Sequence, residues 1–240
     1  MSEVIEQLPR PGSGPMFDRI AGRYDLLNRL MSLGLDRRWR RRLVEAVTRD
    51  IAPGDEILDL ATGTADVAIA IAEARDDLRV IGTDPSPAML AIGREKVSAR
   101  GLSARVQLEE AAAESLPYED GRFAAVTISF GIRNVVDRPR ALREMARVTR
   151  TGGRLGILEL TEPRTGLLAG PARWHLRHVV PALGAWLSRD EEYAYLVRSI
   201  AAFPAPNDFT RTIEDCGWER ARASPLTFGA VHTFEAHKSP

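Results

Sequence analysis

Residues 56–67 read EILDLATGTADV, and the fold follows from this stretch. The run EILDL is a short apolar segment typical of a buried strand, and small residues around Gly63 permit a tight turn into a helix. Similar runs recur, and we expect strands at Glu56–Leu60, Arg79–Thr83, Arg105–Glu109, Ala124–Ser129 and Arg154–Glu159. The amphipathic stretches between them predict helices at Asp66–Ala74, Pro87–Ala99 and Pro139–Thr149. Strands joined by helical crossovers form a parallel, doubly wound α/β sheet.

The segments on either side of this series have a different pattern. Apolar residues recur at helical spacing from Phe17 to Val47, which predicts two helices before the first strand. After Pro163 we expect helices at Leu167–Leu187, Arg189–Ala202 and Asp208–Cys216, the last one capped by Asn207. The closing stretch Trp218–His237 is too short for crossovers, so we expect an antiparallel strand pair at the sheet edge.

These elements predict one domain over residues 16–240, preceded by a flexible leader over residues 1–15. The Pro- and Gly-rich stretch Leu8–Pro15 disfavours both helix and strand. Within the domain, residues 16–50 hold the N-terminal helices, and residues 164–205 form a helical insertion on the substrate side.

The composition excludes several classes of protein. Lys plus Arg and Asp plus Glu number 33 each in 240 residues, so no overall field draws the chain to nucleic acid. Cys216 is the only cysteine, which excludes an internal disulfide, and His175 and His178 lack further ligands at metal-binding spacing, so we expect no metal. No run reaches the ~20 apolar residues that span a bilayer, and the start lacks a secretory signal. We expect a cytoplasmic protein.

An acidic residue follows the second strand where a ribose contact is expected. Asp84 lies about twenty residues beyond the first loop, a position from which carboxylates accept hydrogen bonds from ribose hydroxyls in dinucleotide and adenosyl sites. Structural alternatives stay open, because Asp66 and Asp84 could each cap a helix and Gly63 could serve only the turn. Together, the loop and Asp84 favour a ligand that carries a ribose.

The charge of the loop distinguishes between the two kinds of ribose ligand, dinucleotides and adenosyl compounds. A pyrophosphate requires glycine amides at a helix N-terminus and no anion nearby. Asp59 and Asp66 flank this loop instead, and the three-glycine fingerprint is absent. Carboxylates repel a pyrophosphate but attract a ligand that carries an ammonium and a sulfonium. The sequence therefore favours S-adenosyl-L-methionine as the cofactor, with Asp59 among the residues that bind it.

Four segments together carry a resemblance to a known family. FDRIAGRYDLLNRLMSLGLDRRWRR looks like an N-terminal signature, and LDLATGTAD like a cofactor loop. The stretch from AAAESLPYEDGRF to GGRLGILEL looks like a central signature, and EEYAYLVRSIAAFP like a C-terminal one. TISFGIRNV is the most specific phrase, because generic methyltransferases share only the cofactor loop. From Phe17 to Phe234 the chain resembles the menaquinone and ubiquinone biosynthesis C-methyltransferase family.

This resemblance implies a class I S-adenosylmethionine-dependent methyltransferase fold, with a mostly parallel seven-stranded sheet. It also implies that Thr64, Asp84, Ser129 and the pair Ala112-Ala113 line the cofactor. The chain departs from the family pattern at two positions. Where a glycine usually follows the threonine it has Ala65, which we expect to add a methyl group near the ligand. Ala112 replaces an Asn or Asp expected to bond the adenine, a contact worth roughly 0.5–1.5 kcal/mol.

Arg133 and Asn134 in SFGIRN are the candidates for catalysis. Carbon methylation of a hydroquinone requires a phenolate, which pushes electron density onto the adjacent ring carbon. We expect Arg133 to stabilise this phenolate or to orient a water that takes the phenolic proton. Asn134 could position the phenolate or the water. The structural alternative is that Arg133 pairs with a carboxylate such as Asp137.

Tyr24 is the third catalytic candidate. Tyr24, Asp25 and Asn28 lie within one turn of the predicted N-terminal helix, so they share a face that we expect to cap the pocket. The alternative is that Tyr24 belongs to the core.

The resemblance further implies a polyprenylated quinol as substrate, whose tail must stay in a membrane or an apolar tunnel. The arginines from Arg37 to Arg42 surround Trp39, and basic faces with interfacial tryptophans suit anionic membranes, so we expect peripheral contact at the inner face of the membrane. A solvated helix face is the alternative, and a homodimer stays open.

Menaquinone biosynthesis, with demethylmenaquinol as substrate, is the main functional hypothesis. The alternatives are methylation of the 2-polyprenyl-6-methoxy-1,4-benzoquinol of ubiquinone biosynthesis or of another small aromatic. A binding protein that keeps the fold without turnover is a further alternative, suggested by Ala65 and Ala112 and opposed by the intact SFGIRN.

Overall fold

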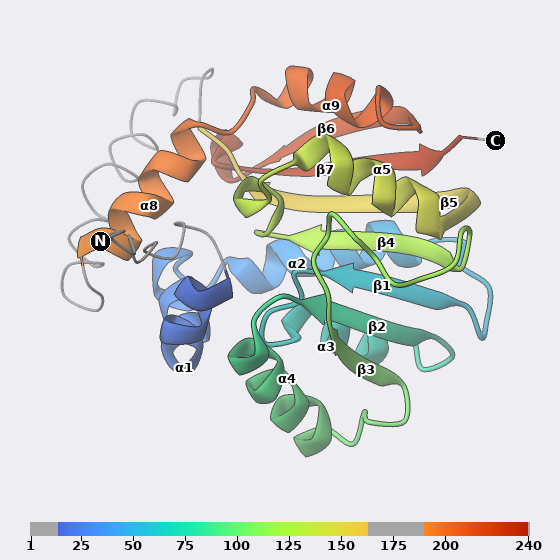
Figure 1. The fold of residues 1–240 in the computed structure, drawn as a ribbon, viewed down its shortest axis with the longest axis horizontal. Helices are drawn as coiled ribbons and strands as arrows, with labels where there is room; N and C mark the ends of the chain where they lie inside the picture. Colours follow the sequence, from blue (N-terminus) through green and yellow to red (C-terminus); the bar gives the residue numbers. More distant parts are fainter. Residues whose placement is uncertain (1–13, 163–189, 240) are drawn as a thin grey trace, which may run out of the picture.

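The computed structural model describes residues 14–162 and 190–239, with a seven-stranded sheet at its centre (Figure 1). The strand order is β3-β2-β1-β4-β5-β7-β6. Strands β1 to β5 pair in parallel, whereas β7 is antiparallel to both β5 and β6. The predicted parallel sheet with an antiparallel pair at its edge is therefore confirmed. The strands are β1 (Glu56–Leu60), β2 (Arg79–Asp84), β3 (Val106–Glu110), β4 (Phe123–Ser129), β5 (Thr149–Leu160), β6 (Trp218–Leu226) and β7 (Val231–Lys238).

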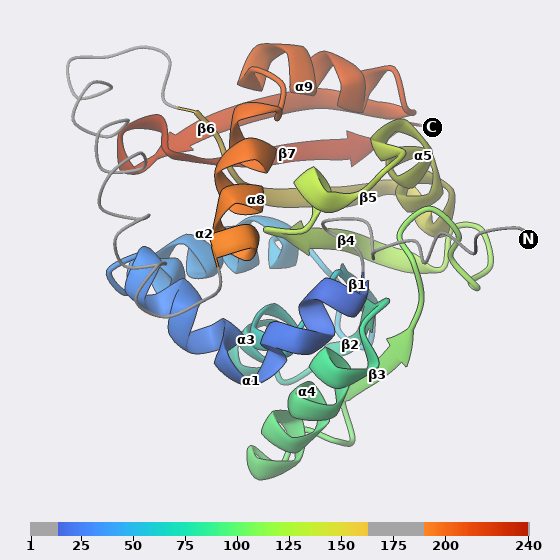
Figure 2. The same ribbon diagram turned by 60° about the vertical axis from the view of Figure 1, so that its left-hand side comes forward.

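Helices cover both faces of this sheet (Figures 1 and 2). Helices α2, α3 and α4 share one buried apolar cluster with the sheet, and α5 and α9 share the other. Helix α1 packs on α4, and α8 lies beside the short helix η1. The described helices are α1 (Gly14–Met31), α2 (Asp36–Thr48), α3 (Asp66–Ala74), α4 (Pro87–Ala99), η1 (Ile132–Asn134), α5 (Arg138–Val148), α8 (Asp190–Ala201), α9 (Pro206–Glu214) and η3 (Thr227–Gly229).

Several boundaries differ from those expected. Helix α9 begins at Pro206 with Ala205 at the N-cap and no side-chain cap, so the predicted cap at Asn207 is wrong. The cause is Pro206, whose fixed φ and missing N–H suit the first helical position and start the helix before Asn207. Strand β5 begins at Thr149 rather than at Arg154, because its pairing with β4 contains a register shift.

The structure describes only part of the predicted leader and part of the predicted insertion. Helix α1 begins at Gly14, inside the range predicted for the leader, and the rest of that leader lies outside the described residues. The predicted helix Leu167–Leu187 also lies outside them, as does most of the predicted insertion, of which α8 is described. None of the described helices is long and apolar enough to cross a membrane.

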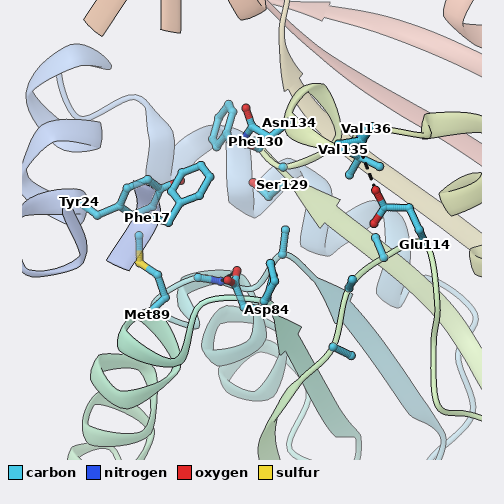
Figure 3. A pocket seen from close by; sticks show the side chains of 17 residues that line it. Phe17, Tyr24, Asp84, Met89, Glu114, Ser129, Phe130, Asn134, Val135 and Val136 are labelled. Carbon is cyan, nitrogen blue, oxygen red and sulfur yellow. Dashed lines mark hydrogen bonds between the residues drawn. The ribbon is translucent and has the colours of Figure 1, made fainter. Parts of the chain in front are cut away.

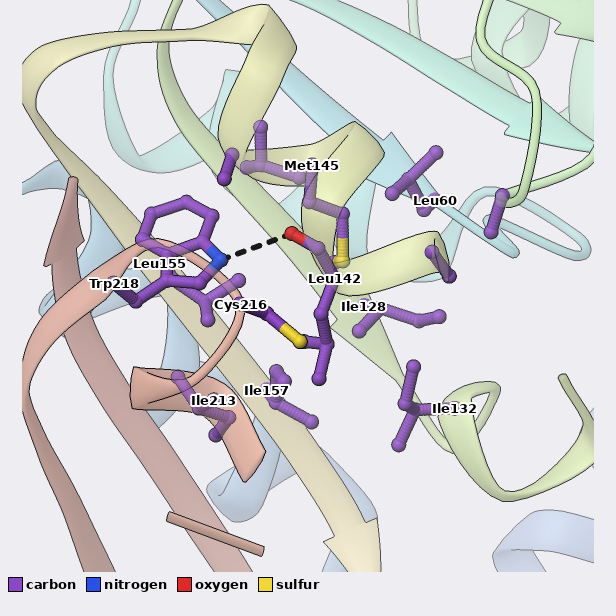
Figure 4. Close-up of a cluster of buried hydrophobic side chains, with 14 of the residues drawn as sticks. Leu60, Ile128, Ile132, Leu142, Met145, Leu155, Ile157, Ile213, Cys216 and Trp218 are labelled. Carbon is purple, nitrogen blue, oxygen red and sulfur yellow. Dashed lines mark hydrogen bonds between the residues drawn. The ribbon is translucent and has the colours of Figure 1, made fainter. Parts of the chain in front are cut away.

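An apolar cluster on the α5 side fixes the loop after β4 (Figure 4). The Trp218 indole of β6 is buried and donates from Nε1 to the Leu142 carbonyl of α5 at 3.1 Å. Ile132 of η1 belongs to the same cluster and is completely buried. The backbone that carries Arg133 and Asn134 is thus anchored in the core rather than in a free loop.

The other face of the sheet depends on a close approach between α2 and β5. A Cβ added at Gly156 of β5 would lie 2.2 Å from Val47 Cγ1 and 2.8 Å from Leu43 Cδ1, both on α2. Both side chains are buried, so neither can move aside without disturbing the core. Glycine is therefore required here for packing.

We predict that Gly156→Ala lowers the free energy of unfolding by about 1–3 kcal/mol, because the added methyl group overpacks the α2–β5 contact. Urea unfolding followed by circular dichroism measures the change. Gly22→Ala is the control, since nothing lies within 4 Å of its added Cβ. Equal midpoints for the two variants would contradict the packing argument.

Candidate active site

A cavity, termed the main cavity, opens at the carboxyl ends of β1, β2 and β4 (Figure 3). Gly63 and Asp84 form its walls from the loops after β1 and β2, and Ser129 from the end of β4. Phe17 and Tyr24 of α1 cover it. Because β1 lies between β2 and β4, this is the point where the strand order changes direction, the usual ligand site of open α/β sheets.

Asp84 joins two loops at the wall of the main cavity. Its Oδ2 accepts a hydrogen bond from Gly63 N at 2.9 Å, and its Oδ1 accepts one from Ser86 N at 2.9 Å. Asp84 does not cap α4. The N-cap is Ser86, whose Oγ accepts a hydrogen bond from Met89 N. A carboxylate has about four lone-pair sites, so Asp84 keeps acceptor capacity for ribose hydroxyls. Burial raises the pKa of Asp84 to about 6.

A second, small cavity adjoins the main one and is polar, with Arg40, Asp59, Thr64 and Asp66 in its lining. Asp59 is buried and accepts a hydrogen bond from Thr62 Oγ1 at 2.7 Å. Burial raises the pKa of Asp59 to about 7, and a cationic ligand group beside it would favour the ionised form. Carboxylates and a guanidinium in one cavity fit the ammonium and carboxylate of an amino-acid ligand.

Thr64 lies where α1 meets the loop after β1. Its Oγ1 donates to Asp25 Oδ1 at 2.6 Å and accepts from Lys96 Nζ at 3.0 Å. Lys96 also pairs with Asp25 at 2.8 Å and with Asp66. Because Asp25 belongs to α1 and Lys96 to α4, these contacts hold α1 against α4, beside which it lies in Figure 2.

Three more of the predicted cofactor residues, Ala112, Ala113 and Ser129, line the main cavity. Ser129 Oγ is buried and meets no hydrogen-bond partner among the described residues. Leaving a buried hydroxyl unpaired costs about 1–3 kcal/mol, so a ligand that bonds to it would be stabilised. The two alanines offer an apolar wall of the kind that an adenine ring packs against. The residues present therefore fit S-adenosylmethionine.

Ala65 lies elsewhere than the sequence suggested. It is completely buried in the core, where a Cβ added at Gly93 of α4 would lie 3.2 Å from its methyl group. Its φ of +66° is left-handed, which explains why a glycine is usual at this position. The expectation of a methyl group near the ligand is wrong, because the departure affects the backbone conformation and not the cavity lining.

Arg133 lines a third cavity, termed the lateral cavity, between the loop after β4 and helices α1, α2 and α8. Its Nη1 donates to Glu159 Oε1 at 2.7 Å and to the Phe130 carbonyl at 2.6 Å. The side chain of Arg133 is 8% exposed and that of Glu159 is fully buried. Asp137, the partner considered from the sequence, instead caps α5 by accepting from Arg140 N.

Asn134 and Tyr24 both line the main cavity. Asn134 Oδ1 accepts a hydrogen bond from the Tyr195 hydroxyl of α8 at 3.0 Å. Tyr24 also lines the small cavity and packs edge-on against Phe17, with ring centroids 6.1 Å apart. Burial raises the pKa of Tyr24, so its hydroxyl stays protonated at neutral pH.

Sequence reasoning missed three residues at this site. Phe130 borders all three cavities, and its φ of +56° turns the chain at the end of β4. Glu159 carried a signal, since a charge within the apolar run LGILEL must be paired when buried. Arg40 was placed with a surface cluster but pairs with Asp66 at 2.8 Å in the small cavity. Within the described ranges, no cluster of His, Cys, Asp or Glu could hold a metal ion.

We predict that Asp84→Asn weakens S-adenosylmethionine binding and alters its pH dependence. In the unmodified protein, affinity falls as the pH drops below about 7, because Asp59 takes up a proton, and it falls more steeply below about 6, because Asp84 then takes up a proton and loses acceptor capacity. Below that pH, the slope of log Kd against pH should be about one unit shallower in the variant, since one titrating group is gone. Calorimetric titrations over about pH 5 to 8 measure both slopes.

Asp120→Asn is the control for this experiment, because the side chain of Asp120 is 79% exposed and should leave the slope unchanged. Identical slopes for the Asp84 variant and the unmodified protein would contradict the assignment of Asp84 to the ribose.

Comparisons with known proteins agree with this geometry. The model of the ubiE/COQ5 methyltransferase family matches residues 10–238. A ubiquinone/menaquinone biosynthesis C-methyltransferase of Syntrophotalea carbinolica is 45% identical over 96% of this chain and 96% of its own length. A demethylmenaquinone methyltransferase of Thermus thermophilus is 46% identical over 90% of this chain and 98% of its own length.

Solved structures support the fold. A putative S-adenosylmethionine-dependent methyltransferase of Methanococcus maripaludis superposes with a TM-score of 0.67, at 15% identity, over 100% of this chain and 98% of its own. A putative methyltransferase from a Haloferax volcanii complex gives 0.66, at 16% identity, over 93% and 98% of the two chains. The chain belongs to the ubiE/COQ5 methyltransferase family and is an S-adenosylmethionine-dependent C-methyltransferase.

Proposed function

We propose that this enzyme methylates a ring carbon of demethylmenaquinol in menaquinone biosynthesis. The observation that carries the proposal is a buried guanidinium, Arg133, in an apolar cavity that shares Phe130 with the main cavity. A fixed positive charge beside an apolar cavity suits a phenolate, the reactive form of a quinol. The relatives from Thermus thermophilus and from Bacteroides fragilis, which are named demethylmenaquinone methyltransferases, support the same substrate.

The second candidate substrate is the 2-polyprenyl-6-methoxy-1,4-benzoquinol of ubiquinone biosynthesis. Several relatives carry names that include both quinones, among them one from Geotalea uraniireducens that is 40% identical over 93% of this chain and 94% of its own. Both substrates present a phenolic oxygen next to the carbon to be methylated, so the same residues serve either one.

Bound S-adenosylmethionine would supply the methyl group and a sulfonium leaving group. In this proposal Asp84, Ala112, Ala113 and Ser129 hold it in the main cavity, and Asp59 and Thr64 do so in the small one. Alignment of the two reactants is then a large part of the rate enhancement.

The chain's own residues prepare the quinol. Arg133 stabilises the phenolate oxygen or orients a water that takes its proton, while Asn134, held by Tyr195, positions the ring or that water. Tyr24 closes the pocket from α1 and excludes bulk water, which strengthens the attraction between Arg133 and the phenolate.

We also propose that the enzyme is cytoplasmic and contacts the inner face of an anionic membrane. Trp39 is buried, with its Nε1 bonded to Thr227 Oγ1 at 2.8 Å, and Arg40 pairs with Asp36 and Asp66, so neither faces lipid. The remaining arginines of the cluster are exposed. Nearby lie four exposed leucines: Leu26, Leu30, Leu33 and Leu35, with exposed fractions of 53%, 36%, 71% and 38%. Basic and apolar side chains together suit an anionic lipid surface.

Loss of the Arg133 charge should abolish most turnover. We predict that the double variant Arg133→Gln/Glu159→Gln lowers kcat on demethylmenaquinol by about 10²–10³ while the Kd for S-adenosylmethionine stays unchanged, because a preorganised charge at the phenolate is gone. Replacing both partners avoids an unpaired buried carboxylate. Transfer of a labelled methyl group measures kcat.

Arg133→Lys is the comparison and should keep part of the activity. Full turnover by the double variant would exclude Arg133 from catalysis.

Membrane contact is tested by flotation with vesicles. We predict that the enzyme floats with anionic vesicles at low salt and dissociates at high salt, because the exposed arginines are screened. Arg37→Glu/Arg38→Glu should lose flotation. Arg211→Glu/Arg222→Glu changes the net charge equally at exposed sites on α9 and β6 and should float normally. Equal flotation of the two double variants would mean that the exposed face of α2 is an ordinary solvated surface.

A further inference from the structure

The lateral cavity is mostly apolar, yet it contains two hydrogen-bond donors that are not used. Its apolar lining includes Trp39, Phe130 and Leu196. Among the described residues, neither Asn28 Nδ2 nor Arg133 Nε meets an acceptor, and both atoms are buried. Both residues line this one cavity although they come from α1 and from the loop after β4.

The other polar groups of the lateral cavity bond elsewhere and, among the described residues, leave these two donors unpaired. Asp36 accepts hydrogen bonds from Arg40 Nη1 at 2.8 Å and from Ser32 Oγ at 3.0 Å. Buried donors are nearly always paired in folded proteins, so two unpaired donors on residues that line one cavity point to an acceptor supplied by a ligand. Two N–H donors, one of them on a cation, suit an oxygen atom that carries negative charge.

Glu159 determines which part of Arg133 is left for that acceptor. Its Oε1 accepts from Arg133 Nη1 at 2.7 Å and from Leu160 N at 2.8 Å, and its Oε2 accepts from Arg133 N at 3.1 Å. The carboxylate is therefore fixed by main-chain and side-chain donors, and it holds Nη1. Nε is left without an acceptor among the described residues, so Glu159 acts as a positioning residue.

We propose that the lateral cavity binds the aromatic ring of a phenolic substrate, and that Asn28 and Arg133 donate hydrogen bonds to one of its ring oxygens. The apolar walls cover the faces of the ring, and Phe130 borders both this cavity and the main one, so the ring lies next to the transferred methyl group. Asn28 then determines specificity by requiring an oxygen at that point. The identity of the phenol as a quinol rests on the proposed function.

The test compares Asn28→Leu and Asn28→Asp with the unmodified enzyme, using demethylmenaquinol with a short isoprenyl tail. Asn28→Leu should raise KM for the quinol about tenfold, the effect of one lost hydrogen bond. Its Kd for S-adenosylmethionine and its Tm should not worsen, because the amide nitrogen that it removes donates to no acceptor among the described residues. Asn207→Leu is the control, because it makes the same change at an exposed residue of α9 that lines none of the three cavities, and it should keep the original KM.

The ranking of the two Asn28 variants by kcat/KM distinguishes a substrate contact from a structural role. Asn28→Asp places a carboxylate against Arg133 and takes the donor away from the substrate, so its kcat/KM should fall below that of Asn28→Leu. A structural role predicts the reverse, since Asp has the shape of Asn. An unchanged KM in Asn28→Leu, or Asn28→Asp at least as active as Asn28→Leu, would overturn the proposal while leaving the proposed function intact.

A binding titration with 1-naphthol covers the case in which the unmodified enzyme does not methylate the quinol. That result would refute the proposed function but not the phenol site. Binding of 1-naphthol to the unmodified enzyme and to Asn207→Leu, with weaker binding to Asn28→Leu, would support the site. Equal binding to all three, or none to any, would overturn it.

Discussion

The hydrogen bond from Gly63 N to Asp84 Oδ2, 2.9 Å long, joins the loop after β1 to the end of β2 and organises the site. Gly63 has a φ of +56°, and an added Cβ would meet only Tyr24 Cε1 at 3.9 Å, so the loop backbone stays open to a ligand. The same loop carries Thr64, through which Asp25 and Lys96 hold α1 over the cavities. One strand-end contact thus positions both the cavity wall and its cover.

Opposite charges are separated across the site. Asp59, Asp66 and Asp84 surround the main and small cavities, where a cationic sulfonium ligand is expected. Arg133 lies in the lateral cavity, where a phenolate would be stabilised. Phe130 stands between the two sides. This arrangement favours a cation on the carboxylate side, and on the other side Arg133, although paired with the buried Glu159, offers a charged donor to a phenolate oxygen.

The spacing of apolar residues and the Gly and Pro turn signals were sufficient to predict the five parallel strands, the helices between them and the antiparallel pair at the sheet edge. The capping of α9 was missed because the preference of Pro206 for the first helical position prevailed over the capping propensity of Asn207. Ala65 and Glu159 show a second limit. The sequence places Ala65 in the loop after the first strand and Glu159 at the end of the fifth, but whether a side chain faces a cavity or the core depends on tertiary contacts, here with Gly93 for Ala65 and with Arg133 for Glu159.

The most direct measurement is a crystal structure of the enzyme with S-adenosylhomocysteine. The account predicts that both ribose hydroxyls lie within hydrogen-bonding distance of the Asp84 carboxylate, that the adenine packs against Ala112 and Ala113, and that the homocysteine group lies in the small cavity beside Asp59. A ribose bound away from Asp84, or a homocysteine group in the lateral cavity beside Arg133, would contradict it.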